Sequence, residues 1–228
     1  MASDGGTMID FHTHILPGMD DGSSSIQESI ALLDAEREQG VETVILTPHY
    51  HPGKETPAQF VQRRQDAMNK LDAWVSMNPV RLYAGAEVEY FDGICQAEGL
   101  ELLTIEGTNL FLLEMPYCAW TERMIRDVLE ISGLRSIAVV LAHIERYLDL
   151  QSVATLDCLL KNGILFQANA SFFLNWKSRR RARKMLQNGQ IHFIGSDCHN
   201  TDRRPPNIGK ITQYIKSYED VLRTNFCS

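Results

Sequence analysis

The chain of 228 residues lacks the features that place a protein in a membrane or in an oxidising compartment. No apolar run approaches the roughly 20 residues that a membrane-spanning helix needs, and no signal-peptide pattern opens the chain. The five cysteines are odd in number and scattered without a CxxC pair, so they indicate neither a disulfide framework nor a thiolate zinc site. We therefore expect a cytoplasmic protein with no membrane insertion.

An excess of basic charge is also missing, since the formal net charge is -7. This balance argues against nucleic acid as a partner, because binding to its phosphates depends on a dominant basic surface. The composition, 44% hydrophobic and 22% charged, is that of an ordinary globular protein and excludes a disordered or fibrous chain. A chain of this length buries a large core without disulfides or a structural metal, so any bound metal is available for chemistry.

Short β-rich apolar runs alternate with longer amphipathic stretches, which indicates parallel strands joined by helices. Seven strands are predicted, at Met8–His12, Glu42–Thr47, Arg81–Glu87, Leu110–Glu114, Ser136–His143, Ile164–Asn169 and Ile191–Ser196. Five helices are predicted, at Ile26–Gln39, Ala58–Met77, Thr121–Ser132, Ser152–Lys161 and Ser178–Asn188. A seven-stranded barrel and an open doubly wound sheet both fit this order, and no glycine-rich nucleotide motif is present.

No linker or internal repeat divides the chain, so we expect residues 8–228 to form a single domain. The small, polar residues 1–7 precede a second methionine, Met8, which begins the first apolar run. We interpret residues 1–7 as a disordered leader or an expression remnant.

Residue types that bind metals gather where the predicted strands end. They are Asp10, His12, His14, His49, Glu87, Glu114, His143, Asp197 and His199. The carboxyl ends of parallel strands meet on one face of the fold, so these side chains would meet in space. A single histidine or glutamate at a strand end more often caps or hydrogen-bonds, but the whole set predicts a metal centre. Imidazoles with carboxylates suit Zn, Mn, Fe or Co.

An ordered series of motifs resembles the PHP (polymerase and histidinol phosphatase) superfamily. Within it, the chain is similar to the manganese-dependent protein tyrosine phosphatases of bacterial capsule and exopolysaccharide synthesis. The motifs are Asp10-Phe-His12-Thr-His14, Asp20-Asp21-Gly22, Thr47-Pro48-His49, Gly85-Ala86-Glu87, Leu112-Leu113-Glu114-Met115-Pro116, Ala142-His143-Ile144-Glu145-Arg146-Tyr147, and Gly195-Ser196-Asp197-Cys198-His199-Asn200 followed by Arg204-Pro205-Pro206. The resemblance runs from Met8 to about Arg223 and implies a distorted seven-stranded (β/α)7 TIM-like barrel of the PHP type.

The resemblance also implies three divalent metal ions, manganese in preference to iron, cobalt or zinc. By position, the first ion would be held by His12, His14, Glu87 and Asp197; the second by Glu87, Glu114 and His143; and the third by Asp21, His49 and His199. Glu87 as a shared ligand is chemically reasonable, because a carboxylate offers two oxygens. Asp20 and Asp21 both suit the third site, and we favour Asp21. Arg146 and Arg204 match phosphate-binding arginines.

The implied reaction is hydrolysis of phosphotyrosine by a hydroxide that bridges two metals, without a phosphoenzyme. The implied partner is a phosphotyrosine-bearing protein, the C-terminal tail of an autophosphorylated bacterial tyrosine kinase that controls capsule or exopolysaccharide synthesis. A homo-oligomer is left open. The basic block from Lys177 to Lys184 is interpreted as the solvated face of a helix, with a docking face for an acidic phosphorylated segment as the alternative.

Other functions fit parts of the pattern. Cys198 and Arg204 have the C-x5-R spacing of thiolate tyrosine phosphatases, but no glycine lies between them to let the loop wrap a phosphate, so we attribute the spacing to chance. A small-molecule phosphatase of the histidinol phosphate type and a TatD-like metal-dependent nuclease would use similar ligands. A metal-loaded, non-catalytic binding module is the remaining alternative, against which the intact ligand set argues.

Overall fold

A computed structural model describes residues 8–134 and 136–212, so residues 1–7, predicted to be a leader, lie outside the described residues. The strands are β1 (Met8–Thr13), β2 (Val41–Leu46), β3 (His49–Tyr50), β4 (Arg81–Ala84), β5 (Glu87–Glu89), β6 (Leu110–Glu114), β7 (Ala138–Leu141), β8 (Leu165–Asn169) and β9 (Phe193–Gly195). The α-helices are α1 (Ile26–Glu38), α2 (Pro57–Asn69), α3 (Asp72–Met77), α4 (Glu122–Leu134), α5 (Val153–Lys161), α6 (Ala170–Leu174) and α7 (Arg179–Gln187). Short 3-10 turns are η1 (Ile94–Gln96), η2 (Leu100–Leu103), η3 (Ile144–Arg146) and η4 (Ile208–Ile211).

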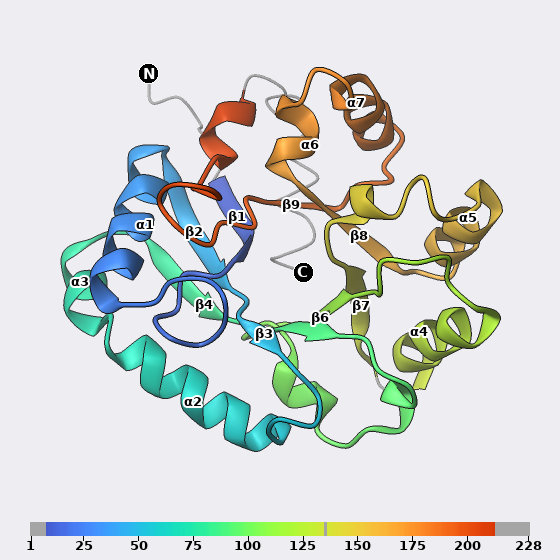
Figure 1. The fold of residues 1–228 in the computed structure, drawn as a ribbon, viewed down its shortest axis with the longest axis horizontal. Coiled ribbons are helices and arrows are strands. Elements are labelled where there is room, and N and C mark those ends of the chain that lie inside the picture. The colour runs from blue at the N-terminus through green and yellow to red at the C-terminus, as the bar shows by residue number, and fades with distance from the viewer. Residues whose placement is uncertain (1–7, 135, 213–228) are drawn as a thin grey trace.

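The strands form two parallel sheets that together curl into a barrel, with helices around the outside (Figure 1). The hydrogen-bonded orders are β1-β2-β4 and β3-β5-β6-β7-β8-β9. The edges formed by β1 and β9 meet just beyond β9, where Asp197 N donates to His12 O at 2.8 Å and His14 N donates to Cys198 O at 2.9 Å. The predicted distorted barrel is therefore confirmed, and the open doubly wound sheet is excluded.

Every predicted strand position contains a strand, but the prediction was wrong about continuity. The predicted strand Arg81–Glu87 is divided into β4 and β5, and the two-residue strand β3 follows β2 after Pro48. Proline has no N–H to donate, which interrupts the regular ladder there. The β2–β4 pairing ends with Gly85 N donating to Leu46 O at 2.8 Å, and pairing resumes beyond the breaks, where Glu87 N donates to Pro48 O at 3.1 Å. The breaks leave His49 and Glu87 paired side by side.

Side chains alternate between the inside of the barrel and the layer under the helices, as the period of two in a strand requires. Leu110 and Leu112 of β6 belong to a small inner cluster, whereas Phe111 and Leu113 belong to the larger cluster packed under the helices. A stacked pair of rings lies in the inner cluster, Phe11 and Phe193, with centroids 4.0 Å apart. The inner cluster fills the barrel with apolar side chains below the face where the strands end.

The helices differ from prediction at two places. The expected helix Ala58–Met77 is broken into α2 and α3 around Leu71, and the break lets both Leu71 and Trp74 reach the core. The short helix α6 was not predicted, and it buries Phe172 and Phe173. Within residues 8–134 and 136–212, no helix combines the length and the apolar character required to cross a membrane.

Candidate metal centre

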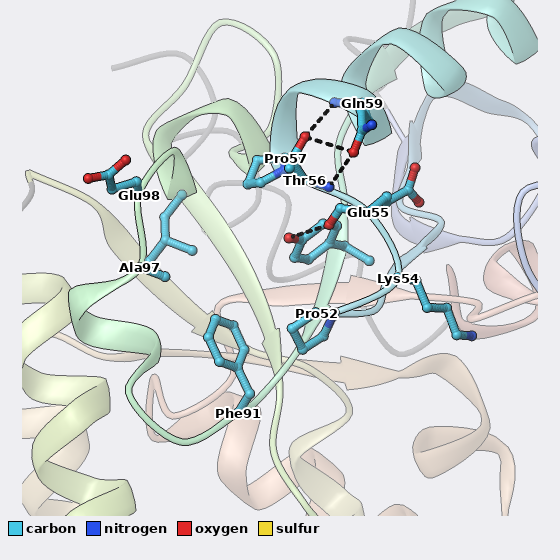
Figure 2. Close-up of a pocket in the computed structure, with 12 residues that line it drawn as sticks. Pro52, Lys54, Glu55, Thr56, Pro57, Gln59, Phe91, Ala97 and Glu98 are labelled. Atoms are coloured by element: carbon cyan, nitrogen blue, oxygen red, sulfur yellow. Dashed lines mark hydrogen bonds between the residues drawn. The ribbon is translucent and has the colours of Figure 1, made fainter.

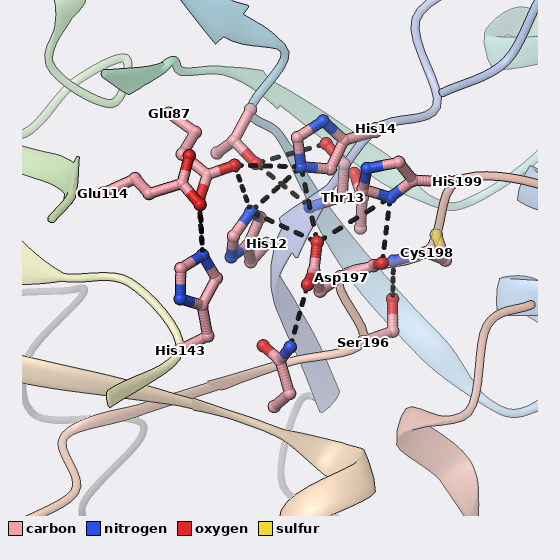
Figure 3. Close-up of polar contacts among 12 residues, drawn as sticks. His12, Thr13, His14, Glu87, Glu114, His143, Ser196, Asp197, Cys198 and His199 are labelled. Atoms are coloured by element: carbon pink, nitrogen blue, oxygen red, sulfur yellow. Dashed lines mark hydrogen bonds and ion pairs between the residues drawn. The ribbon is translucent and has the colours of Figure 1, made fainter. Parts of the chain in front are cut away.

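Four predicted ligands converge at the carboxyl ends of β1 and β9 and at Glu87, the first residue of β5 (Figure 3). The Nε2 atoms of His12 and His14 lie 3.0 Å apart, and each lies 3.1 Å from Glu87 Oε2. Asp197 Oδ1 lies 3.7 Å from His12 Nε2 and 3.5 Å from His14 Nε2. A cation about 2.1 Å from each donor would space adjacent donors by about 3.0 to 3.4 Å. The spacing of these atoms therefore fits ligands that share one cation.

A second cluster is built around the other oxygen of Glu87. His143 Nε2 lies 2.9 Å from Glu87 Oε1 and 3.2 Å from Glu114 Oε1. The Nδ1 atom of His49 lies 3.3 Å from Glu87 Oε2 and is buried without a hydrogen-bond partner. Glu87 thus joins the two clusters, and its side chain is 1% exposed. A carboxylate in this position can serve two cations at once.

The third cluster lies toward the solvent, beside His14. It contains Asp21 Oδ1, which is 3.4 Å from His199 Nε2 and 3.7 Å from His49 Nε2. His199 Nε2 is buried and makes no hydrogen bond. The two nitrogens of His49 thus face different carboxylates. Nε2 faces Asp21 of this cluster, and Nδ1 lies 3.3 Å from Glu87 Oε2 and 3.8 Å from Glu114 Oε2, whereas the resemblance assigned His49 to the third site alone.

Asp20 has a different environment from Asp21. Its Oδ2 accepts hydrogen bonds from His14 Nδ1 at 2.7 Å and from His49 N at 2.8 Å, while Oδ1 accepts from Gly22 N at 2.9 Å. Both oxygens are therefore engaged, and hydrogen bonding of this kind fixes the tautomer and orientation of a metal-binding imidazole. The Asp21 side chain is 67% exposed, which leaves its oxygens available. The geometry favours Asp21 as the ligand and Asp20 as the residue that orients His14.

The two arginines predicted to bind phosphate both reach the centre and both contact Asp197. Arg146 Nη2 lies 3.0 Å from Asp197 Oδ2, and its Nη1 lies 3.3 Å from Glu114 Oε1. Arg204 Nη2 lies 2.6 Å from the same Asp197 oxygen. Each arginine side chain is 39% exposed, so each guanidinium lies between the ligand carboxylates and the solvent.

A chain of amides on β8 supports the ligands from below, and the sequence interpretation missed it. Gln167 Oε1 accepts from His143 N at 2.6 Å and lies 3.3 Å from His12 Nδ1. Gln167 Nε2 donates to Asn169 Oδ1 at 3.0 Å, and Asn169 Nδ2 donates to Asp197 Oδ2 at 2.8 Å. Gln167 and Asn169 occupy alternate positions at the end of β8, so they lie on the same side of the strand. This spacing was the one signal in the sequence that could have predicted their shared role. Ligands of both main clusters are therefore tied to one strand.

Two candidate ligands have left-handed backbones that residues other than glycine rarely adopt. The φ angles are 32° at His143 and 56° at Asp197. Such conformations cost about 1 to 3 kcal/mol and persist where surrounding contacts enforce them. Here the backbone N–H of His143 is held by Gln167, and that of Asp197 by His12 O. The fold thus maintains strained positions at two ligands.

Burial and neighbouring charges shift the pKa values of the side chains in the centre when no metal is bound. Burial disfavours the charge on His143, but hydrogen bonds to Glu114 and Glu87 outweigh it and raise its pKa to about 9. Burial likewise opposes ionisation of Glu87 and Asp197, yet attraction to His12 is the largest of the effects that hold both pKa values well below normal. Burial lowers the pKa of His199 to about 4, helped by the nearby positive charge of His14. Ionised carboxylates and a neutral His199 are the forms that bind metals.

The Cys198 thiol faces away from the metal clusters. Its side chain is buried, and Sγ lies 3.8 Å from Glu36 Oε1 of α1. Burial, with the charges of Glu36 and Asp10, raises the pKa of this thiol well above normal. A thiolate nucleophile needs the opposite, a lowered pKa and access to substrate. The C-x5-R spacing therefore does not form a phosphate-binding loop, because Arg204 turns to Asp197 instead.

A hollow of about 510 Å³ lies between the segment before α2 and the turn that contains Phe91 (Figure 2). It is lined by apolar residues such as Pro52, Pro57 and Phe91, together with the charged Lys54 and Glu98. None of the nine predicted ligands is among its lining residues. The chemistry indicated by the metal clusters is therefore located elsewhere, at the carboxyl ends of the strands.

Comparison with known proteins agrees with this geometry. The chain is 32% identical over 230 residues to the tyrosine-protein phosphatase CpsB of Streptococcus pneumoniae, covering 96% of this chain and 91% of that protein. It is 29% identical over 207 residues to the tyrosine-protein phosphatase YwqE of Bacillus subtilis (strain 168), covering 86% and 79%. The crystal structures of YwqE and CpsB, described as unique metal-dependent tyrosine phosphatases, include a chain that superposes with a TM-score of 0.75 and 25% identity, over 97% of this chain and 88% of that one.

A more distant relation concerns the fold alone. The putative histidinol phosphatase hisK of Listeria monocytogenes superposes with a TM-score of 0.52 at 11% identity, over 92% of this chain and 99% of that one. The family model for capsular polysaccharide synthesis, CpsB/CapC, matches residues 8–225. The resemblance predicted from the motifs is thereby confirmed, and the chain belongs to the CpsB/CapC family.

Proposed function

We propose that this protein is a metal-dependent tyrosine phosphatase that hydrolyses phosphotyrosine in a protein substrate. One observation carries the proposal: buried Glu87 lies within 3.1 Å of the Nε2 atoms of three histidines, His12, His14 and His143, with its two oxygens turned to different clusters. Such an arrangement suits a bridge between cations. The tyrosine phosphatase activity of the relatives CpsB and YwqE supports the same function.

The residues fit three divalent ions, with manganese as our preference. His12, His14, Glu87 and Asp197 would hold the first, Glu87, Glu114 and His143 the second, and Asp21, His49 and His199 the third. His49 Nδ1 is in reach of the second group as well. Divalent ions in such a centre supply a hydroxide nucleophile near neutral pH and offset the charge of the phosphoryl group.

The chain's own contribution is to bind and orient the phosphate. Arg146 and Arg204 present partly exposed guanidiniums at the rim, where they can donate to non-bridging phosphate oxygens. Both are held by Asp197 Oδ2, so their positions are set before substrate arrives. Preset donors stabilise developing charge without reorganising during the reaction. The roles are binding and charge stabilisation, and no side-chain nucleophile is required.

The partner we propose is the acidic, phosphorylated C-terminal tail of a bacterial tyrosine kinase in the cytoplasm. The basic segment predicted from the sequence contains α7, whose exposed face carries Arg179, Arg180 and Arg181 while Ala182 and Met185 are buried. This concentration of positive charge in an otherwise acidic protein would attract a chain of opposite charge. A nuclease would instead need a basic surface around the centre itself.

The test of the activity begins with metal-free protein that is reloaded with manganese. We expect metal content approaching three ions per chain, hydrolysis of p-nitrophenyl phosphate and a phosphotyrosine peptide, and loss of both activities with chelator. Glu87→Ala should lose more metal than Arg146→Ala, because Glu87 offers one oxygen to each main cluster, whereas Arg146 contacts ligand carboxylates and offers no metal-binding atom. Full activity with one ion or none would overturn the metal-dependent proposal.

The proposed partner is tested separately with the double substitution R179E/R180E. Reversing two exposed charges should raise KM for a multiply phosphorylated, Glu-rich peptide about tenfold at low salt, and leave p-nitrophenyl phosphate kinetics unchanged. The control is K54E, which reverses one exposed charge outside α7, on the 510 Å³ hollow, and should change neither. Equal kinetics for the double variant and the wild type on the acidic peptide would exclude α7 as the docking face.

A further inference from the structure

A second hollow adjoins the metal centre at the end of β6. Its volume is about 270 Å³, and its charged lining residues are Glu114, a predicted ligand, Arg146, a predicted phosphate-binding residue, and Glu89. The rest of the lining includes Tyr90, Met115, Pro116, Tyr117 and Tyr147. Charged and aromatic side chains line one cavity, which is the general form of a site for a ligand with a charged head and a ring.

The floor of this hollow is fixed by hydrogen bonds and ring packing. The hydroxyl of Tyr147, a residue that is 1% exposed, donates to Met115 O at 2.7 Å. The ring of Trp120 packs on Tyr147 with centroids 5.0 Å apart, and Trp120 Nε1 donates to Pro116 O at 3.2 Å. The segment after β6 is therefore held in one conformation, and the hollow is formed before any ligand enters.

The walls are fixed in the same way on either side. Tyr90 N donates to Glu114 O at 2.9 Å, and the Tyr90 hydroxyl donates to Asp127 Oδ2 at 2.7 Å. On the opposite side, Gln151 Nε2 donates to Cys118 O at 2.7 Å and Gln151 Oε1 accepts from Trp120 N at 3.0 Å. These contacts hold the short loop that carries Tyr117.

Tyr117 itself is 75% exposed, although its neighbours in the loop are held firmly. Core packing does not explain an aromatic side chain in this position. Tyr117 and Arg146 line the same cavity, so the ring can contact a ligand whose phosphate is bound by Arg146. Contacts between aromatic rings add about 0.5 to 1.5 kcal/mol beyond the area they bury.

We propose that this hollow is the aryl subsite of the enzyme, which receives the tyrosyl ring while the phosphate lies between Arg146 and the metal clusters. The inference rests on the proposed phosphatase function and extends it to substrate choice. A phosphotyrosine holds its phosphate one ring farther from the peptide backbone than a phosphoserine does. A phosphate bound by Arg146 would therefore leave the tyrosyl ring within the cavity that Tyr117 lines, whereas a serine phosphate would have to draw the peptide backbone into the cavity.

The experiment compares Tyr117→Ala, Tyr117→Phe and the control Trp176→Ala. Trp176 is an equally exposed aromatic residue, 74% against 75%, between α6 and α7, outside this hollow. Two readouts are used with manganese-loaded protein: calorimetric binding of phenylphosphonate and of methylphosphonate, and kcat/KM for matched phosphotyrosine and phosphoserine peptides. Metal content and melting temperature are recorded for each variant.

The subsite predicts a selective loss. Tyr117→Ala should weaken phenylphosphonate binding about tenfold and leave methylphosphonate binding unchanged, while Tyr117→Phe and Trp176→Ala behave as the wild type. The same variant should lower kcat/KM for the phosphotyrosine peptide alone. Equal losses for both phosphonates, or wild-type binding of phenylphosphonate by Tyr117→Ala, would overturn the subsite. Failure of the wild type to hydrolyse either peptide would instead overturn the proposed function, and phenylphosphonate binding would still test the hollow.

Discussion

Gln167→Met tests whether the amide chain on β8 controls metal binding. The side chain is fully buried, and methionine nearly matches its volume while it removes the contacts to His143 N at 2.6 Å, His12 Nδ1 at 3.3 Å and Asn169 Oδ1 at 3.0 Å. Partners that orient metal-binding imidazoles typically contribute about 10- to 100-fold in metal affinity. We therefore expect manganese affinity to fall by that factor, equivalent to about 1.4 to 2.8 kcal/mol.

The variant also loses stability without metal, so this effect must be separated from the loss of affinity. An unpaired buried donor costs about 1 to 3 kcal/mol, and the N–H of His143 loses its partner here. The control is Gln39→Met, because Gln39 also makes three hydrogen bonds, to Ala35 O, Pro206 O and Gly209 N, far from the clusters in the barrel.

Both variants should melt at a lower temperature than the wild type in chelator, by a few degrees per kcal/mol in a chain of this size. Only Gln167→Met should then require about 10 to 100 times more manganese for half-maximal loading in a calorimetric titration. Wild-type manganese affinity in Gln167→Met, or an equal loss in Gln39→Met, would refute the role that we assign to the amide chain.

Three other outcomes are expected. Arg146→Ala and Arg204→Ala should each lower kcat/KM on phosphotyrosine peptides about 10- to 100-fold with near-normal metal content, and lysine should restore only part of the loss; wild-type kinetics in both would place the phosphate elsewhere. Cys198→Ser should keep most of its activity, because the thiol is buried against Glu36; a thousandfold loss would restore the thiolate mechanism. Metal binding should release protons at pH 7, since His143 has its pKa raised to about 9 and must become neutral to bind. Titrations in buffers of different ionisation enthalpy that show no proton release would contradict this. The protonated His143 also stabilises the metal-free protein; this contribution is complete below pH 6.5 and is lost as the pH rises through about 9.

The sequence predicted the positions of the strands and the chemical types at their ends, because both follow from local patterns. Alternation of apolar residues marks a strand, and the parallel architecture brings strand ends to one face. This reasoning was sufficient to bring His12, Glu87 and Asp197 together without any knowledge of distances. It was also sufficient to separate Cys198 from the ligands on either side of it.

The remaining features depend on three-dimensional contacts that local patterns do not carry. In the sequence, Gln167 cannot be distinguished from other polar residues in strands. Its role depends on the hydrogen bond from His143 N, which follows β7, to its Oε1 atom. The two-sided position of His49 depends on a ring orientation, and the choice between Asp20 and Asp21 depends on which carboxylate the fold buries. The break between α2 and α3 depends on the packing of Leu71 in the core. Tertiary packing determines each of these, so sequence alone could not.

The closure of the barrel between β1 and β9 affects when the enzyme becomes active during its synthesis. Asp10 accepts a hydrogen bond from Ser196 N, a contact between residues 186 positions apart, and the first metal cluster joins the same two ends of the chain. A growing chain that has not yet produced Asp197 has His12 and His14 but cannot complete this cluster. Contacts of such long range form late and slow the folding of a domain. Full metal loading would therefore report that the chain has been made past His199 and that the barrel has closed, and a chain that stops before Asp197 would lack a complete first cluster.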